Sequence, residues 1–297
     1  MAKILDGTAT AEAIRREVAR GVKELQREHG VTPGLAAVLV GDDPPSAVYV
    51  RNKGRACERV GILSQTFHLP QETGQQELVR LIDGLNRDAR FHGILVQLPL
   101  PSQMDEQEVL YRVDPDKDVD GLHPVNMGRL VSGESPFLPC TPHGIQQLLL
   151  RNGYDPAGKR VVVCGRSQIV GKPLAILLMQ KKPGANATVT VCHTGTRDLA
   201  SVTREADILV AAMGSPQAIT ADMVKEGVVV VDVGVNRVED PSAERGYRLV
   251  GDVDFEGVSR KAEAISPVPG GVGPMTISML LVNTLTAARR AVERDRG

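Results

Sequence analysis

The chain has 297 residues, of which 42% are hydrophobic and 24% charged, with a formal net charge of −1. This size and composition fit a globular protein of two domains and exclude a disordered tail, while the near-zero charge excludes a basic field for nucleic acid. Without a signal-peptide pattern or an apolar run of the ~18 residues that a membrane span needs, we expect a cytoplasmic protein with no nucleic-acid partner and no membrane partner.

Helical and strand patterns alternate through the first half of the chain. Strands separated by helices of this length indicate βαβ units and a mainly parallel sheet. In chain order we predict a helix over 8–29 ended by Gly30, a strand over 35–41, a helix from Ser46 as N-cap to Val60 with Gly61 as its stop, a strand near 65–69, a helix over 74–87 and a strand over 93–101.

The alternation restarts after an acidic loop at 114–121 and a Pro/Gly-rich stretch at 132–144, and we place a domain boundary near 138–141. The strands that follow are apolar enough to be buried on both faces, which is typical of an open doubly wound sheet. We predict a helix near 143–151, strands over 159–165, 187–192, 207–212 and 228–234, and a tail helix from Pro274.

The strongest local signal is VVVCGRSQIVGKPLAILL at 161–178, in which a β-branched strand runs into Gly165, a turn and Gly171 before a helix. Such a turn directs backbone N–H groups and a helix N-terminus at a pyrophosphate. Ser167 occupies the middle position of G-x-G-x-x-G, so the match is imperfect, and a plain structural turn is the alternative. The strands that follow favour dinucleotide binding.

Cofactor choice depends on the end of the next strand, Cys192-His193-Thr194, which offers no acid to bind a ribose 2′-hydroxyl. Arg166 on the glycine turn provides a cation for a 2′-phosphate. The sequence therefore favours NADP over NAD.

The segment DPDKDVDG at 114–121 resembles the opening of a calcium loop. Its twelfth position is Met127 in place of the bidentate Glu, and Pro115 and Pro124 do not suit that loop. We read it as a solvated turn or as a carboxylate directed at a polar ligand. The four cysteines show no C-x-x-C spacing, so we expect no metal site.

Two further segments carry candidate site residues. Tyr49 and Lys53 share one helical face at i, i+4, although such a Lys is usually a surface residue. Gln97 lies in an otherwise apolar strand, where a buried amide needs partners, and Lys53 could be one. The loop PVPGG at 267–271 precedes a helix and can approach a ligand through its backbone, although it is also compatible with a rigid turn.

Together these segments resemble the bifunctional methylenetetrahydrofolate dehydrogenase/cyclohydrolase family. The resemblance covers nearly the whole chain in the family's order, and it rests on VGDDPPSAVYVRNKGRACERVGI (40–62), GILVQLPLP (93–101), PDKDVDGLHPVNMGRL (115–130), PCTPHGI (139–145), GRSQIVGKP (165–173), GDVDF (251–255) and PVPGGVGPMT (267–276).

The resemblance implies an α/β protein of two domains with the active-site cleft between them. The first is a folate-binding catalytic domain at 1–138, to which the helix 275–297 returns, and the second is an NADP-binding Rossmann-type, doubly wound domain at 139–274. It also implies tetrahydrofolate one-carbon derivatives as substrates and a homodimer.

The resemblance further assigns site residues. The catalytic set is Lys53, Tyr49, Gln97 and Asp120, in which Asp120 bonds the pterin, Tyr49 orients the folate and Gln97 holds the Lys53 amine. The cofactor set is Gly165, Arg166, Ser167, Ile169, Gly171 and Thr194, the last where many members carry a Ser near the 2′-phosphate; the substrate-binding set is Pro269, Gly270 and Gly271.

The implied chemistry suits these residue types. Hydride transfer from 5,10-methylenetetrahydrofolate needs position more than an acid or base, whereas hydrolysis of the resulting methenyl cation needs a proton acceptor such as an amine brought near neutrality by burial and by the cation itself. Three alternatives remain at this point: a dehydrogenase without cyclohydrolase activity, a non-catalytic NADP-binding module, and an amino-acid or shikimate-type dehydrogenase.

Overall fold

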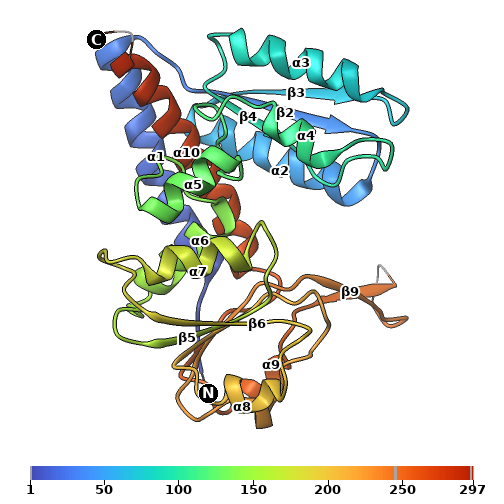
Figure 1. The fold of residues 1–297 in the computed structure, drawn as a ribbon, viewed down its shortest axis with the longest axis vertical. Helices are drawn as coiled ribbons and strands as arrows, with labels where there is room; N and C mark the ends of the chain where they lie inside the picture. The colour runs from blue at the N-terminus through green and yellow to red at the C-terminus, as the bar shows by residue number, and fades with distance from the viewer. Residues whose placement is uncertain (1, 244–245, 295, 297) are drawn as a thin grey trace. The chain divides into compact units, whose positions relative to one another are not determined.

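The computed structural model describes residues 2–243, 246–294 and 296. The chain folds into two compact units. The first, here called the three-strand unit, comprises Glu12–Cys140 and Ile277–Gly297, and the second, the six-strand unit, comprises Met1–Ala11 and Thr141–Thr276. Each unit is built on a parallel sheet with helices packed against it, which confirms the predicted two-domain α/β class (Figure 1).

The three-strand unit has its longest buried strand in the middle of the sheet, in the order β3-β2-β4. All seven residues of β2 (Gly34–Val40) are buried, as expected for a strand covered on both faces. Its even-numbered residues, such as Val38, pack against Leu78 and Ile82 of α3. The remaining elements of this unit are β3 (Leu63–Leu69), β4 (Gly93–Val96), α2 (Pro44–Val60), α3 (Gln75–Arg87), α4 (Glu106–Tyr111), α5 (Pro124–Ser132) and most of α1 (Gly7–His29) and α10 (Val272–Arg294).

Helix α2 begins and ends at residues with clear physical roles. Its N-cap is Asp43, whose carboxylate accepts hydrogen bonds from the backbone N–H and the hydroxyl of Ser46. The prediction of Ser46 as N-cap was wrong because Pro44 and Pro45 start the helix three residues earlier, at positions where a missing N–H costs nothing. Gly61 ends it in the left-handed region at φ 82°, as predicted.

The six-strand unit has the strand order β1-β11-β8-β7-β5-β6, with all neighbours parallel. The chain passes from β5 to β6 on one side and then returns to β7 on the other, so the winding direction reverses next to β5. The strands are β1 (Lys3–Ile4), β5 (Arg160–Cys164), β6 (Thr188–Cys192), β7 (Ile208–Ala211), β8 (Val229–Asp232) and β11 (Ala264–Ile265); the antiparallel pair β9 (Asn236–Glu239) and β10 (Tyr247–Val250), and the helices α6 (Cys140–Arg151), α7 (Gly171–Met179), α8 (Leu199–Thr203), η1 (Ala221–Met223) and α9 (Phe255–Val258), complete the unit.

Two strand predictions need correction. The strand predicted over 93–101 ends at Val96, so Gln97 follows the strand and does not lie within it, because Pro99 and Pro101 lack the N–H groups that would continue the strand pairing. The strand β6 was expected to be buried on both faces, but it is an edge strand whose residues are mostly exposed or half-buried. Among the described residues, no helix combines the length and hydropathy needed to cross a bilayer.

Candidate functional site

Lys53 and Gln97 form the centre of the candidate site in the three-strand unit. Lys53 lies on the face of α2 that also buries Val50 and Cys57, and it is only 9% exposed. Its Nζ donates a hydrogen bond of 3.0 Å to Oε1 of Gln97, directly after β4. Gln97 Nε2 donates in turn to the Leu98 carbonyl at 2.7 Å. The amide oxygen therefore faces the amine, and the Lys53–Gln97 contact considered in the sequence analysis is present.

Tyr49 lies one turn before Lys53 on α2, and it is 41% exposed. The pair thus combines a buried amine with an accessible aromatic ring on neighbouring turns. Such an arrangement lets a planar ligand lie on the ring while its reactive group reaches the amine.

The acidic loop brings Asp120 to the same region. The Ile94 N–H of β4 donates to the Lys117 carbonyl at 2.8 Å, so the loop runs alongside that strand. Asp120 accepts a hydrogen bond from the Cys140 N–H through its carbonyl at 3.3 Å. Burial and then the charge of Asp120 raise the pKa of the Cys140 thiol well above its usual value, while the Lys53 ammonium opposes this. The charges of Lys53 and Asp120 therefore both influence the pKa of the Cys140 thiol. The sequence analysis did not identify Cys140 as a residue of this region.

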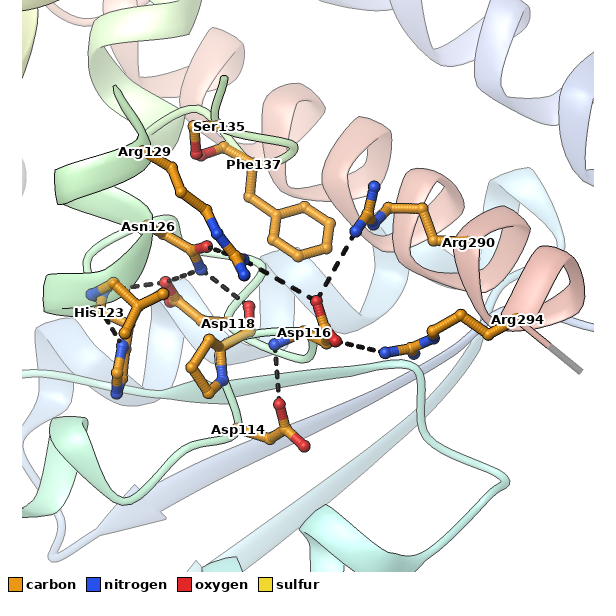
Figure 2. Close-up of polar contacts among 12 residues, drawn as sticks. Asp114, Asp116, Asp118, His123, Asn126, Arg129, Ser135, Phe137, Arg290 and Arg294 are labelled. Carbon is orange, nitrogen blue, oxygen red and sulfur yellow. Dashed lines mark hydrogen bonds and ion pairs between the residues drawn. The ribbon is translucent and has the colours of Figure 1, made fainter. Parts of the chain in front are cut away.

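Asp118, two residues earlier, is an internal anchor (Figure 2). Its carboxylate accepts hydrogen bonds from the backbone N–H groups of Gly121 (3.1 Å), Leu122 (3.3 Å) and His123 (2.8 Å), and from Asn126 Nδ2 (2.9 Å). Burial raises the pKa of Asp118, against the hydrogen bonds from Asn126 and His123. The carboxylate thus fixes the backbone of the turn that directly follows Asp120.

Asp116 joins the same loop to two helices. It pairs with Arg129 of α5 at 4.0 Å and with Arg290 of α10 at 3.8 Å, and it hydrogen-bonds to Arg294 of α10 (Figure 2). The three acids of the calcium-like pattern therefore have different surroundings. Within the part of the chain that the structure describes, no group of three or more His, Cys, Asp or Glu residues could hold a metal ion.

The six-strand unit carries a cavity of about 500 Å³ at the carboxyl ends of β5, β6 and β7. This is the place where the winding reverses, and open α/β sheets bind ligands at that point. The cavity is lined by Cys164, Gly165, Arg166, Ser167, Cys192, His193, Thr194, Thr196, Leu199, Ala212, Met213 and Ser215.

The glycine turn after β5 is closely packed. A Cβ atom at Gly165 would overlap the Ala212 carbonyl oxygen, and one at Gly171 would overlap the Gly165 carbonyl oxygen. Ser167 Oγ accepts a hydrogen bond from the Val170 N–H at 3.1 Å and so holds the turn. Glycine at these two positions therefore lets the turn pack closely against its neighbours, which fits the predicted cofactor loop.

Of the predicted cofactor residues, Gly165, Arg166, Ser167 and Thr194 line the cavity. Gly171 starts α7, and Ile169, on the turn, is 49% exposed. The sequence analysis did not assign His193 or Thr196 to the cofactor site. Their side chains shape the turn after β6, since the His193 N–H donates to Thr196 Oγ1 at 2.8 Å and the Gly195 N–H donates to His193 Nδ1 at 3.0 Å. The sequence analysis also missed Met213 and Ser215 after β7. Their only signal was their position at the carboxyl end of a predicted strand.

The loop with Pro269, Gly270 and Gly271 also lies in the six-strand unit, before α10. Gly270 has φ 105°, which side chains rarely adopt. A Cβ atom at Gly7 would overlap the Gly271 carbonyl oxygen, so the start of α1 holds this loop. The loop is therefore packed closely against the start of α1 at Gly271.

Comparison with known families matches both halves of the chain. Residues 5–120 match "Tetrahydrofolate dehydrogenase/cyclohydrolase, catalytic domain", and residues 139–292 match "Tetrahydrofolate dehydrogenase/cyclohydrolase, NAD(P)-binding domain". The first match contains the Lys53 centre and the second contains the cavity.

Curated relatives and solved structures agree. The chain is 58% identical to the "Bifunctional protein FolD" of Dehalococcoides mccartyi (strain CBDB1), over 98% of both chains. It is similar to the bifunctional FolD methylenetetrahydrofolate dehydrogenase/cyclohydrolase of Campylobacter jejuni (TM-score 0.92, 48% identity, 98% of this chain and 100% of that one). It is equally similar in fold to the Trypanosoma brucei enzyme solved with NADP cofactor and inhibitor (TM-score 0.92, 43% identity, 98% of both chains).

Proposed function

Because the chain belongs to the tetrahydrofolate dehydrogenase/cyclohydrolase family, and is thus a bifunctional methylenetetrahydrofolate dehydrogenase and methenyltetrahydrofolate cyclohydrolase, we propose that Lys53, Tyr49, Gln97 and Asp120 form its folate centre. The observation that carries this proposal is the buried Lys53 amine, held 3.0 Å from Gln97 Oε1. The Asp120 carboxylate accepts hydrogen bonds from the pterin, and Tyr49 supports the ring system.

In the hydrolytic step, water attacks the carbon of the methenyl cation, and Lys53 takes the proton that the water loses as the C–O bond forms. The resulting carbinol then opens: the same amine returns its proton to N5 as the C–N5 bond breaks, and the carbinol hydroxyl releases its proton to water as its oxygen becomes the carbonyl of the formyl group on N10. The net reaction consumes one water and releases one proton. Gln97 presents a neutral acceptor, which orients the amine without adding a negative charge that would hold it protonated.

We propose that the cavity beyond β5, β6 and β7 takes NADP. The cofactor, when bound, supplies the hydride acceptor. The close-packed glycine turn from Gly165 to Gly171, which leads into α7, fits the pyrophosphate, Arg166 and the Thr194 hydroxyl fit the 2′-phosphate, and Ser167 and Ile169 complete the turn. The absence of an acid at the end of β6 supports NADP over NAD.

We propose that Pro269, Gly270 and Gly271 contact the substrate through their backbone, supported by the glycine contacts that fix this loop. We also propose functional domains at 1–138, with 275–297, and at 139–274. The compact units support this division except at the start of the chain, where β1 pairs with β11 in the six-strand unit.

We propose a homodimer and a cytoplasmic location. β3 is a seven-residue edge strand with Leu63 47% exposed, and an edge of this kind is a template for pairing with a second chain. The four cysteines are free and buried, which suits a reducing compartment. Mass measurement in solution tests the dimer, and a monomer at micromolar concentration would contradict it.

Two activities measured on one preparation test the proposed centre. Purified protein is incubated with 5,10-methylenetetrahydrofolate and NADP while NADPH absorbance is followed, and separately with methenyltetrahydrofolate while its loss is followed. We expect both reactions, with higher kcat/KM for NADP than for NAD. Reduction of NADP without hydrolysis above background would contradict the proton-transfer role of Lys53, and reduction with shikimate or an amino acid instead would contradict the substrate.

A further inference from the structure

The carboxylate of Asp252 accepts hydrogen bonds from the backbone of one turn that lines the cofactor cavity. Asp252 lies between β10 and α9 and is 0% exposed. Its Oδ2 accepts hydrogen bonds from the backbone N–H groups of Met213 (2.6 Å) and Gly214 (2.9 Å). Its Oδ1 accepts from the Ser215 N–H (2.9 Å) and from Asn236 Nδ2 (2.9 Å). Four donors thus surround one buried carboxylate.

The three backbone donors are consecutive, and only Ala212 separates them from the carboxyl end of β7. Successive N–H groups that converge in this way form an anion-binding nest. Met213 and Ser215 line the cavity, so the shape of this wall depends on the anion inside the nest. Because Asp252 already occupies the nest, these N–H groups are not free for cofactor phosphates, and the turn serves as a fixed wall.

A second buried acid fixes Asp252 itself. Oδ1 of Asp232, at the end of β8, accepts hydrogen bonds from the N–H groups of Gly234 (3.0 Å) and Asp252 (2.9 Å), and its Oδ2 accepts from Val253 (3.0 Å). A Cβ atom at Gly234 would overlap the Asp252 carboxylate, and one at Gly251 would overlap the Asp232 carboxylate. Because the backbone at Gly234 and Gly251 packs so closely against these two carboxylates, Asp252 is held beside the turn.

We infer that Asp252 is a positioning residue of the cofactor site, whose carboxylate holds the Met213–Ser215 turn in the shape that accepts NADP. This inference rests on the proposal that the cavity is the NADP site. Since hydrolysis of the methenyl cation consumes no cofactor, Asp252 acts on NADP binding and hydride transfer and leaves hydrolysis unchanged. A purely structural role would affect both activities together.

The test compares Asp252→Asn with Asp254→Asn. In the first variant an amide NH₂ replaces one acceptor oxygen and faces N–H donors, so the turn shifts. In the control, Asn keeps the N-cap that Asp254 gives to Gly257 of α9, two residues farther along the chain. Calorimetric titration with NADP should show Kd raised about tenfold in Asp252→Asn, equal to ~1.4 kcal/mol, and unchanged in Asp254→Asn.

The same preparations are assayed for both reactions. We expect KM for NADP to rise with Kd in Asp252→Asn, while KM for the folate and the hydrolysis rate stay at wild-type values. Wild-type NADP affinity in folded Asp252→Asn, or hydrolysis that falls in step with NADP affinity, would overturn the inference.

If Asp252→Asn does not fold, Asn236→Ala replaces it, since it removes a single donor to the carboxylate; unchanged NADP affinity there would equally overturn the inference. Wild-type protein that binds NADP but does not oxidise the folate would contradict the proposed function alone, because the Asp252 comparison is made on binding.

Discussion

Replacing Lys53 by Met removes the amine and keeps an unbranched side chain between α2 and the sheet. In the wild-type protein Gln97 Oε1 accepts a hydrogen bond of 3.0 Å from Lys53 Nζ. Loss of this donor destabilises the folded protein by about 1–3 kcal/mol if no water replaces it. The substitution also removes a cation from a site only 9% exposed, which acts in the opposite direction. We therefore expect little net change in the free energy of unfolding, so activity losses report on chemistry.

Loss of a general base typically slows a reaction about a hundredfold to ten-thousandfold, or ~3–5.5 kcal/mol in the barrier. Methenyltetrahydrofolate hydrolysis by Lys53→Met should fall to near background, while NADPH formation, which needs only positioning from this residue, should persist within about tenfold. Lys53→Arg is the matched variant, because it keeps the positive charge but does not release a proton near neutral pH. It should hydrolyse as poorly as Lys53→Met.

The reasoning fails if Lys53→Met hydrolyses methenyltetrahydrofolate at the wild-type rate above the uncatalysed background. The proton would then leave to another group or to water alone. A parallel loss of both activities, with an unfolding midpoint like that of the wild type, would instead assign Lys53 to substrate binding.

Four further substitutions test other parts of the site. Arg166→Ala should weaken NADP far more than NAD in steady-state kinetics, since a guanidinium suits the 2′-phosphate, and equal losses would argue against that role. Asp120→Ala should impair both folate reactions while a chelator leaves the wild type unchanged; activity restored by calcium after chelation would reverse this assignment. Gln97→Glu places a carboxylate beside the amine and favours its protonated form, so hydrolysis at neutral pH should fall more than dehydrogenation, and equal effects would speak against a proton-accepting amine. Burial lowers the pKa of His143 from 6.5 to about 4, so the unfolded chain binds a proton between these values that the folded chain does not. The contribution of His143 to the free energy of unfolding is thus fully present above about pH 6.5 and is lost as pH falls toward 4. In urea unfolding, the free energy of unfolding of the wild type should therefore drop between about pH 8 and pH 5, and His143→Gln should make this drop smaller by about 2 kcal/mol. An equal drop in both proteins would contradict this.

Local patterns predicted the parts of the site that depend on one helix or one turn. The i, i+4 spacing of Tyr49 and Lys53 is a property of any helix, and Gly61 at φ 82° shows why a glycine ends this one. The Lys53–Gln97 contact was also predictable, because an amide in an apolar stretch requires a partner and a helix-borne amine was the candidate.

The different surroundings of the three aspartates in the acidic loop could not be predicted from the sequence. Asp116, Asp118 and Asp120 look equivalent along the chain, yet Asp118 is buried, Asp116 pairs with arginines and Asp120 is half-buried. What distinguishes them is long-range: the bridge from Ile94 and the amide of Asn126 draw one carboxylate inward. No local periodicity encodes such contacts.

The pairing of β1 with β11 also has a consequence for how the protein is made. Lys3 and Ile4 leave the ribosome early, but their partners Ala264 and Ile265 are synthesised only after most of the chain has emerged. Contacts of such large sequence separation carry a high loop-closure cost and form late. The sheet of the nascent six-strand unit therefore ends at β8 until β11 and β1 have paired. During translation the unpaired edge of β8 is a template for pairing with another chain, and the arrival of β11 and β1 removes it.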